Sequence, residues 1–269
     1  MDQWIEIIKY ILLGIIQGVT EIFPISSSGH LTLFSHLFKM DMTSFPTFLM
    51  ITNTGSFLAL LYFFRRDVGQ LIKGTFCYLI RKDETGKDDF IYVLKLIVAV
   101  IPVGLMGLLI KDYLPDDLLS VGFALIITSG LLFYVYKQRD IQWKNDVTWQ
   151  NALVIGAFQM FAIFPGISRS GITISGGLTQ KIELKKVLRF SFLSYLVISV
   201  PVSILGLYEA FQTNESIHYV GYTLAFIMSF VFSLISVRFL YNYVKVKNLV
   251  YFSIYCFIIG LVAITLYII

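Results

Sequence analysis

The sequence predicts an all-α integral membrane protein with six transmembrane helices and two re-entrant helical hairpins, arranged as an inverted-topology internal repeat. Of its 269 residues, 57% are hydrophobic and only 14% are charged, and the mean hydropathy of +0.78 is too high for a soluble domain of this size. Six apolar runs are long enough to cross about 30 Å of hydrocarbon. In addition, one short phrase occurs twice, about half the chain apart.

The repeated phrase joins a proline to a cluster of hydroxyl residues and a glycine. Its first copy is Ile22–Gly29 (IFPISSSG), and its second is Ile163–Gly171 (IFPGISRSG), with one extra glycine after the proline. In each copy an apolar helical run is broken by proline, and the residues that follow are suited to begin a second helix. Such half-helices present backbone N–H groups and hydroxyls to an anion. Matched broken segments in two repeats therefore indicate a binding site.

The predicted elements follow from the apolar runs and from where they are interrupted. The region Trp4–Phe38 holds the first copy and Thr148–Thr179 the second. Each is predicted to be a re-entrant hairpin, because non-helical backbone at membrane depth persists only where protein or a cavity covers it. The six predicted spans are Phe45–Phe64, Phe90–Ile110, Asp117–Tyr136, Phe190–Ala210, Tyr219–Tyr241 and Leu249–Ile269.

We expect one membrane domain, residues 1–269, with a first repeat at about 1–140 and a second at about 148–269. Each half then holds one hairpin and three spans, and an odd number of spans inverts one half relative to the other. The N-terminal run carries Asp2 and Glu6 and lacks the basic start and small-residue cleavage site of a signal peptide. We therefore expect it to be retained.

The basic residues predict the orientation. If the segment between Phe64 and Phe90 lies in the cytoplasm, most of the 21 Lys and Arg residues face that side, and such an excess in short loops marks the cytoplasmic side. Both termini then face outside, and the tips of the two hairpins, entering from opposite sides, meet near the midplane. Scattered basic residues do not indicate a nucleic-acid partner. The basic residues left outside are Lys9, Lys39 and Lys111.

Polar side chains around the first proline are candidates for chemistry. Gln17 and Glu21 lie one turn apart on one helical face, and a carboxylate in a membrane is a functional hypothesis by default. The hydroxyls of Ser26–Ser28 can cap the next helix or bind a phosphate, since both uses have the same geometry. His30 follows Ser27 by three residues and is expected to share its helical face, within reach of its proton.

Arg169 is the most discriminating residue of the second copy. It aligns with Ser27 of the first copy, and a guanidinium at membrane depth needs an anion, for which its planar fork matches phosphate oxygens. The alternative is an ion pair with Glu21 that only joins the two halves. The donors that surround the arginine in the sequence are Ser168, Ser170 and Thr173.

These motifs resemble the two signature regions of the undecaprenyl-diphosphate phosphatase family, the bacitracin-resistance type. The resemblance rests on Gln17-x-x-x-Glu21, on Pro24–His30 (PISSSGH) and on Pro165–Thr173 (PGISRSGIT), and it covers nearly the whole chain. It implies an enzyme of the bacterial plasma membrane that removes the terminal phosphate from undecaprenyl diphosphate, assisted by a divalent cation. This reaction regenerates the lipid carrier for cell-wall synthesis and confers bacitracin resistance.

The resemblance also implies roles for individual residues. Glu21, Ser27, His30 and Arg169 are expected to be catalytic, and Ser26, Ser28, Ser168, Ser170 and Thr173 to bind phosphate. Glu21 with Gln17 is expected to hold Mg²⁺ or Ca²⁺, cations that prefer oxygen ligands. Either Ser27 attacks with His30 as its base, or His30 activates a water and Ser27 only binds.

Two departures and two rival functions stay open at this point. The first residue of the metal pair is a glutamine, and Leu49 stands where the family often carries an acidic residue. The rivals are a transporter of polyprenyl phosphate or another anionic lipid, which also suits inverted repeats with broken helices, and a non-enzymatic lipid-binding protein. His30 favours an enzyme, because a carrier needs no acid–base group. The expected partners are a prenyl diphosphate lipid and membrane lipids, with a homodimer left open.

Overall fold

The computed structural model describes residues 2–40, 45–110, 113–139, 146–212 and 218–269. In these ranges the protein is all-helical, and no β-strand forms there. Six helices are long and apolar enough to cross a membrane, and long apolar segments are typical of bilayer spans. The chain is therefore a multi-pass membrane protein. Lys111, which the charge argument assigns to the outside, is not among the described residues.

All six predicted spans are confirmed as long apolar helices. Their boundaries agree within a few residues, except that α9 begins one and a half turns before the predicted Phe190, because its first turns are too charged to count as an apolar run. The six helices are α3 (Phe45–Phe63), α5 (Lys87–Ile110), α6 (Leu118–Lys137), α9 (Leu184–Gln212), α10 (Tyr219–Tyr243) and α11 (Leu249–Ile268).

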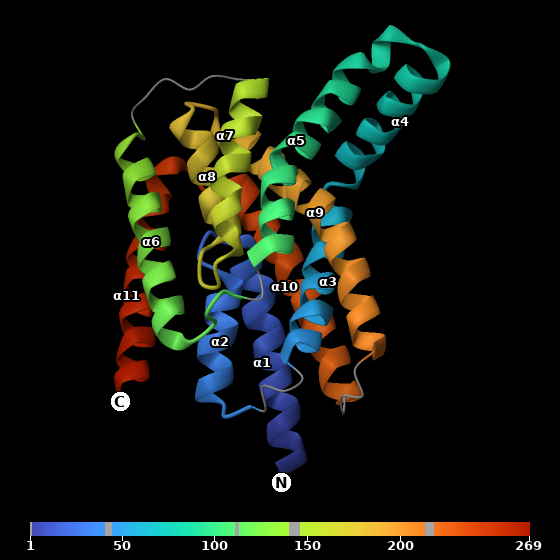
Figure 1. Cartoon of the computed structure of the whole chain (residues 1–269). Coiled ribbons are helices and arrows are strands. Elements are labelled where there is room, and N and C mark those ends of the chain that lie inside the picture. Colours follow the sequence, from blue (N-terminus) through green and yellow to red (C-terminus); the bar gives the residue numbers. More distant parts are fainter. Residues whose placement is uncertain (1, 41–44, 111–112, 140–145, 213–217) are drawn as a thin grey trace.

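The two interrupted regions fold as two pairs of helices. The first pair is α1 (Asp2–Ile22) and α2 (Ser27–Leu37); the second is α7 (Trp149–Met160), the short η3 (Phe161–Ile163) and α8 (Arg169–Thr179). Figure 1 shows the first pair in the half of the molecule that holds both termini and the second pair in the opposite half. The turns of the two pairs come together between these halves.

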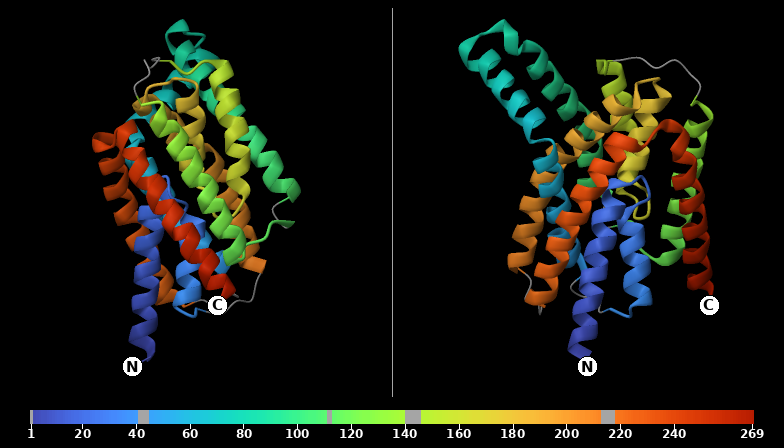
Figure 2. Two further views of the ribbon diagram at one scale, coloured as in Figure 1. Left: turned by 90° about the vertical axis from the view of Figure 1, so that its left-hand side faces the viewer. Right: turned by 180° about the vertical axis from the view of Figure 1, so that it is seen from behind.

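The segment after α3 is helical, which the search for apolar runs did not predict. It forms α4 (Arg65–Arg81), followed by the short η1 (Glu84–Gly86), and α4 packs against α5. Its apolar residues recur at helical spacing between charged ones, so it is amphipathic rather than uniformly apolar. Together α4 and the first part of α5 form an arm that leans away from the bundle (Figures 1 and 2).

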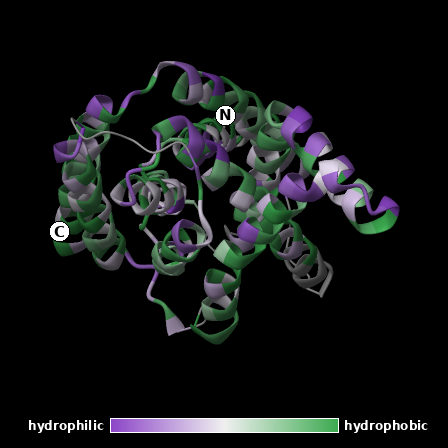
Figure 3. Ribbon diagram, turned by 90° about the horizontal axis from the view of Figure 1, so that it is seen from above, coloured by the Kyte–Doolittle hydropathy of each residue, from purple (hydrophilic) through white to green (hydrophobic). Residues whose placement is uncertain are grey.

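Small residues set the closest helix contacts. α1 packs against α10, and a Cβ placed on Gly18 would lie 2.6 Å from the Ser229 carbonyl oxygen. Ser229 in turn donates to the Thr52 carbonyl oxygen of α3 at 2.7 Å, so hydroxyls link the helices where backbones approach. Close packing and interhelical hydrogen bonds are the main forces between helices in lipid. Seen from above, hydrophobic residues predominate along the helices, and hydrophilic ones gather at the loops and along the arm (Figure 3).

Candidate active site

The site forms where the turn between α1 and α2 meets the turn between η3 and α8. The Gly166 amide donates to the Ser28 hydroxyl at 3.2 Å, and the Ser170 hydroxyl donates to the Phe23 carbonyl oxygen at 3.1 Å. Gly166 has a φ of +92°, and a Cβ there would lie 2.8 Å from the Val121 carbonyl oxygen. Only glycine fits this left-handed, closely packed position without strain.

Both copies of the repeated phrase begin a helix, as the sequence predicts. The Ser26 hydroxyl accepts from the Gly29 amide at 3.2 Å at the start of α2, and the Ser168 hydroxyl accepts from the Gly171 amide at 3.1 Å at the start of α8. Ser26 has a φ of 72°, a left-handed conformation that costs about 1–3 kcal/mol for a residue with a side chain. Two helix N-termini, each with the partial positive charge of a helix start, therefore lie where the two turns meet.

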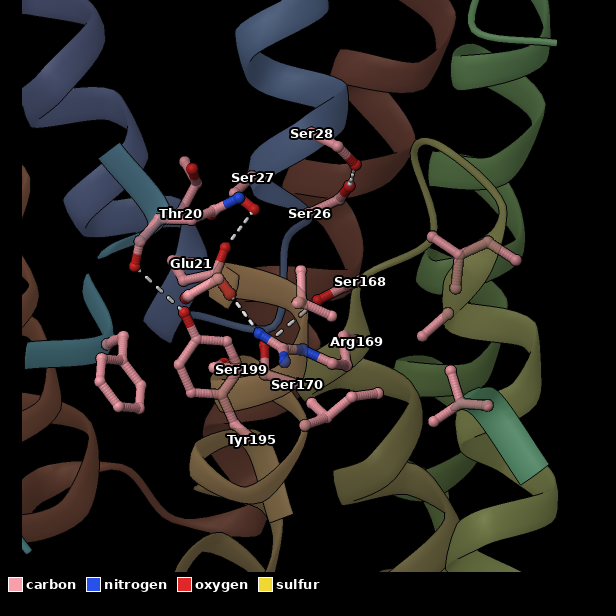
Figure 4. Close-up of a pocket in the computed structure, with 18 residues that line it drawn as sticks. Thr20, Glu21, Ser26, Ser27, Ser28, Ser168, Arg169, Ser170, Tyr195 and Ser199 are labelled. Carbon is pink, nitrogen blue, oxygen red and sulfur yellow. Dashed lines mark hydrogen bonds and ion pairs between the residues drawn. The ribbon is translucent and has the colours of Figure 1, made fainter. Parts of the chain in front are cut away.

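A cavity of about 280 Å³ opens at this meeting point (Figure 4). Its polar lining comes from the two turns and from α1, α2, α3, α8 and α9, and it includes four of the five predicted phosphate-binding hydroxyls and Arg169. Its apolar lining comes from α3, α5, α9, η3 and the turn that follows η3. The polar lining residues are Thr20, Glu21, Ser26, Ser27, Ser28, Asn53, Ser168, Arg169, Ser170, Tyr195, Ser199 and Ser203.

Glu21 is the centre of the polar network. One carboxylate oxygen, Oε1, forms an ion pair with the Arg169 guanidinium. The other, Oε2, accepts from the Ser27 hydroxyl at 2.5 Å and from Gln17 Nε2 at 3.1 Å. The Glu21 side chain is 8% exposed and that of Arg169 is 25% exposed, so the guanidinium has the more open side toward the cavity. The ion pair weighed as an alternative at the sequence level does form, but it lies in the cavity wall beside a hydroxyl.

Tyr195 of α9 supports the guanidinium from below. The Arg169 guanidinium carbon lies 3.6 Å from the centroid of the Tyr195 ring, a cation–π arrangement that is worth more where water is excluded. The Tyr195 hydroxyl donates to the Asn53 carbonyl oxygen at 3.4 Å, which connects the ring to α3. The plane of the guanidinium is thus held on one face by Tyr195 and on one edge by Glu21.

The residues predicted to hold a metal offer oxygen ligands but only one carboxylate. Gln17 Nε2 donates to Asn53 Oδ1 at 2.6 Å as well as to Glu21, while Gln17 Oε1 is buried and has no hydrogen-bond partner in the part of the chain that the structure describes. Among the described residues no group of three or more His, Cys, Asp and Glu side chains comes together. Mg²⁺ commonly binds through one or two carboxylates plus the phosphates of its substrate. Glu21 lines the cavity and fits a cation shared with a diphosphate, whereas Gln17 is 1% exposed and lies behind Glu21, outside the cavity lining.

His30 lies behind the cavity wall rather than in it. Its Nδ1 is 2.7 Å from the Ser26 carbonyl oxygen, and its Nε2 is 2.8 Å from the Tyr255 hydroxyl of α11. Because a carbonyl oxygen only accepts, Nδ1 carries the proton and Nε2 accepts from Tyr255. His30 is 1% exposed and is absent from the cavity lining. The structure therefore brings Ser27 to Glu21 and leaves His30 with other partners.

Thr173 and Leu49, two further positions singled out in the sequence, do not line the cavity. The Thr173 hydroxyl donates to the Arg169 carbonyl oxygen at 2.8 Å and is paired with Ser191 at 2.5 Å. It thus braces the first turn of α8 against α9 and does not line the cavity. Leu49, where the family resemblance leads us to look for an acidic side chain, packs against an apolar cluster that includes Leu13 and Tyr222.

The sequence analysis missed three of these contributors, Asn53, Tyr195 and Tyr255. Asn53 carried a usable signal, because it lies in a Thr-Asn-Thr run inside an otherwise apolar span, and polar groups at membrane depth are costly. Tyr195 and Tyr255 carried none. Tyrosines are frequent in this chain, which has 16 of them, and only the tertiary structure distinguishes the two that contact Arg169 and His30.

Comparison with known proteins agrees with this geometry. The family model described as bacitracin resistance protein BacA matches residues 10–262. A protein of Acholeplasma laidlawii named undecaprenyl-diphosphatase is 57% identical over 277 residues and covers 100% of both chains. A Bacillus thuringiensis protein named undecaprenyl-diphosphatase 2 is 38% identical over 264 residues, 97% of each chain, and an undecaprenyl-diphosphatase 1 of Halalkalibacterium halodurans is 35% identical over 98% of this chain and 97% of its own. The chain belongs to the bacitracin resistance protein BacA family.

Proposed function

We propose that this protein hydrolyses undecaprenyl diphosphate to undecaprenyl phosphate and inorganic phosphate in the cavity between the two turns. The observation that carries the proposal is the meeting of an arginine, two helix N-termini and a hydroxyl–carboxylate pair in one pocket within a bundle of apolar helices. The relatives named undecaprenyl-diphosphatase support this substrate. The product is the lipid carrier of cell-wall synthesis, and its recycling agrees with the bacitracin resistance in the family description.

The proposed setting is the bacterial plasma membrane, with the two helix pairs as re-entrant hairpins of an inverted repeat. The support is that α1 and α7 start at opposite ends of the molecule and stop near its middle, where each is followed by a capped half-helix (Figure 1). The loops at the end opposite the termini hold most of the basic residues, which favours that end as cytoplasmic. Both termini then face outside, and the cavity receives its substrate from there.

The diphosphate is bound by donors that already point into the cavity. Arg169 presents the guanidinium edges that Glu21 leaves unused, and the first backbone N–H groups of α2 and α8 present partial positive charge. These groups stabilise the negative charge that spreads over the transferred phosphoryl oxygens. Because Ser26 and Ser168 cap the two helices, their hydroxyls shape the pocket, and Ser27 and Ser28 are the hydroxyls more exposed to it.

In the proposed reaction Ser27 is the nucleophile and Glu21 is its base. The Ser27 oxygen attacks the terminal phosphorus, its proton passes to Glu21 across their 2.5 Å hydrogen bond, and the bond from that phosphorus to the bridging oxygen breaks. Undecaprenyl phosphate leaves with the electron pair of that bond. Water then attacks the phosphoserine, and the bond from its phosphorus to the Ser27 oxygen breaks. Glu21 returns its proton to that oxygen, which restores the Ser27 hydroxyl and the carboxylate, while the oxygen and both protons of the water leave in the inorganic phosphate. His30 keeps the turn in place through the Ser26 carbonyl.

A divalent cation, Mg²⁺ or Ca²⁺, would be held by Glu21 and by Gln17 Oε1, together with phosphate oxygens of the substrate. It would supply positive charge that offsets the charge of the diphosphate. The buried and unpartnered Gln17 Oε1 supports this assignment, because such an atom costs free energy unless a partner satisfies it.

The proposal is tested by phosphate release from undecaprenyl diphosphate by the purified protein in detergent, with and without EDTA. We expect release by the parent protein and loss of that release in EDTA, restored by Mg²⁺ or Ca²⁺. A protein that binds the lipid diphosphate and releases no phosphate under any of these conditions would instead be a carrier or a lipid-binding protein. The opposed half-helices are also a transporter architecture, so this result would favour movement of the lipid across the bilayer.

A further inference from the structure

An apolar groove of about 570 Å³ runs between the arm and the bundle, apart from the polar cavity. Its walls come from α3, α4, α5 and α9, and Thr75 is the one polar side chain among the described residues that line it. Its volume lies in the range of small-molecule sites, about 300–1,000 Å³. Several of its side chains are open to the outside, among them Ile72 at 65% and Phe76 at 52% exposed. The groove is therefore a surface channel and not a sealed packing defect.

The groove and the polar cavity meet at α3 and α9. Phe57 of α3 lines both of them. On α9, Tyr195 and Ser199 line the cavity, while Leu196 and Val200, the next residues along the helix, line the groove. α9 thus borders both sites: hydroxyl-bearing residues line the cavity together with Ile198 and Val202, and only apolar residues of α9 line the groove.

We infer that this groove holds the first isoprene units of the substrate's tail, so that the arm is part of the substrate-binding site. The inference rests on the proposed function and deepens it. A prenyl diphosphate is a charged head joined directly to a branched hydrocarbon. The protein offers the matching surfaces side by side, a polar cavity for the head and an apolar groove for the tail. A headgroup drawn from the outer side to the midplane leaves its tail toward the cytoplasmic half, where the groove lies.

The groove contributes shape rather than hydrophobic driving force. The tail is already in hydrocarbon before it binds, so moving it into the groove removes little apolar surface from water. What the groove adds is dispersion contact with fixed side chains and an orientation of the bridging phosphate oxygen relative to Ser27. Bulk lipid, which has no diphosphate, gains no such fixed position. A lipid diphosphate whose head is bound in the cavity has its tail directed into the groove. The surrounding lipids are not held in this way, so the groove favours the lipid diphosphate over them.

Photolabelling with a prenyl diphosphate that carries a diazirine in its second isoprene unit tests this inference. The probe is applied to the purified parent protein in detergent, and labelled residues are located by mass spectrometry. We expect labels on the groove residues of α4 and α9, displaced by excess undecaprenyl diphosphate. Labels on lipid-facing residues of α11, such as Tyr251 and Ile254, are expected to resist displacement.

A pair of tryptophan variants on α5 provides the matched control. Val93 lines the groove, whereas Ile97, one turn further along, is 41% exposed and does not. Val93→Trp is expected to fill the groove and to lower displaceable labelling about tenfold, equivalent to about 1.4 kcal/mol of tail binding. Ile97→Trp is expected to leave it unchanged.

Labels that are spread equally over α4 and α11, or that undecaprenyl diphosphate does not displace, would show bulk lipid only and overturn the inference. Unchanged displaceable labelling in a Val93→Trp protein that elutes as the parent does would also overturn it. If the tryptophan variant fails to fold, the labelling pattern of the parent protein still tests the inference. Displaceable labelling of the groove without phosphate release would support the tail site and contradict the proposed hydrolysis. Phosphate release without displaceable labelling would do the reverse, so failure of the inference and failure of the proposed function are distinguishable.

Discussion

Ser27 stands at the start of α2 with its hydroxyl committed to a carboxylate in another helix. The Ser27 hydroxyl lies 2.5 Å from Glu21 Oε2, which is the base in the proposed reaction, and Ser27 is the first residue of α2, at a helix N-terminus where negative charge is stabilised. Ser28 is its neighbour on the same turn and contacts Ser26 and Gly166 instead. The two serines therefore differ in their proposed roles: Ser27 reacts, whereas Ser28, which also lines the cavity, joins the two turns and offers one hydroxyl to the phosphate.

Replacing Ser27 by alanine is expected to remove essentially all turnover, because the proposed nucleophile is lost. A phosphoenzyme is expected to accumulate in the parent protein when the reaction with labelled substrate is quenched in acid. Ser28→Ala is the control and is expected to keep activity within about tenfold, since a single hydrogen bond is worth about 1 kcal/mol. Substantial turnover in Ser27→Ala without a phosphoenzyme would assign the attack to water.

Tyr255 is expected to act through His30 rather than on the substrate. Tyr255→Phe removes the donor to His30 Nε2 and leaves the ring stacked on the imidazole, so we expect a loss of about 1 kcal/mol of stability and a change in kcat/KM of less than tenfold.

His30→Gln is expected to preserve more activity than Glu21→Gln. If His30→Gln were the more damaging change, the base would be His30 and the assignment of Glu21 would be wrong.

At the scale of elements, the long helices and both interruptions could be predicted because hydropathy and proline act locally. The amphipathic α4 escaped the search for apolar runs, because glycines and polar residues interrupt its apolar residues. Most residues of the site could be predicted from the sequence, but the hydrogen-bond partners of those residues could not. The spacing of Ser27 and His30 put them on one face, but His30 is held by Tyr255, which is 225 residues away, and spacing along a helix carries no information on such contacts.

Close helix packing at Gly18 makes a prediction about stability. A Cβ on Gly18 would lie 2.6 Å from the Ser229 carbonyl oxygen, so Gly18→Ala is expected to separate α1 from α10 and to lower the thermal midpoint of the purified protein. At Gly69 of α4 such a Cβ meets no described residue within 4 Å. Gly69→Ala is therefore expected to stabilise its helix by about 0.5–1 kcal/mol. Equal midpoints for the two variants would contradict the packing described for α1.

The whole molecule makes a prediction about sidedness. Asp116 lies before α6 on the side of the termini, Asp83 lies at the tip of the arm, and both are exposed. In a background without Cys77 and Cys256, a membrane-impermeant thiol reagent applied to intact cells is expected to label Asp116→Cys and not Asp83→Cys. The reverse pattern would place the mouth of the site in the cytoplasm.

Two arginines of this protein have nearly the same surroundings, which allows the sharpest test of where the chemistry occurs. Arg169 is paired with Glu21 and lies over Tyr195 in the cavity; Arg189 is paired with Asp67 at 2.6 Å and lies over Tyr92, away from the cavity. Both side chains are 25% exposed. Replacing either one by alanine therefore removes an ion pair and a cation–π contact of the same kind.

The measurement is phosphate release from undecaprenyl diphosphate by the Arg169→Ala and Arg189→Ala proteins, purified in the same detergent. The account predicts that Arg169→Ala abolishes release, that Arg169→Lys restores little of it because a point charge does not replace the bidentate fork, and that Arg189→Ala stays within about tenfold of the parent. Near-parental release by Arg169→Ala or Arg169→Lys would contradict the claim that this cavity binds and cleaves the diphosphate.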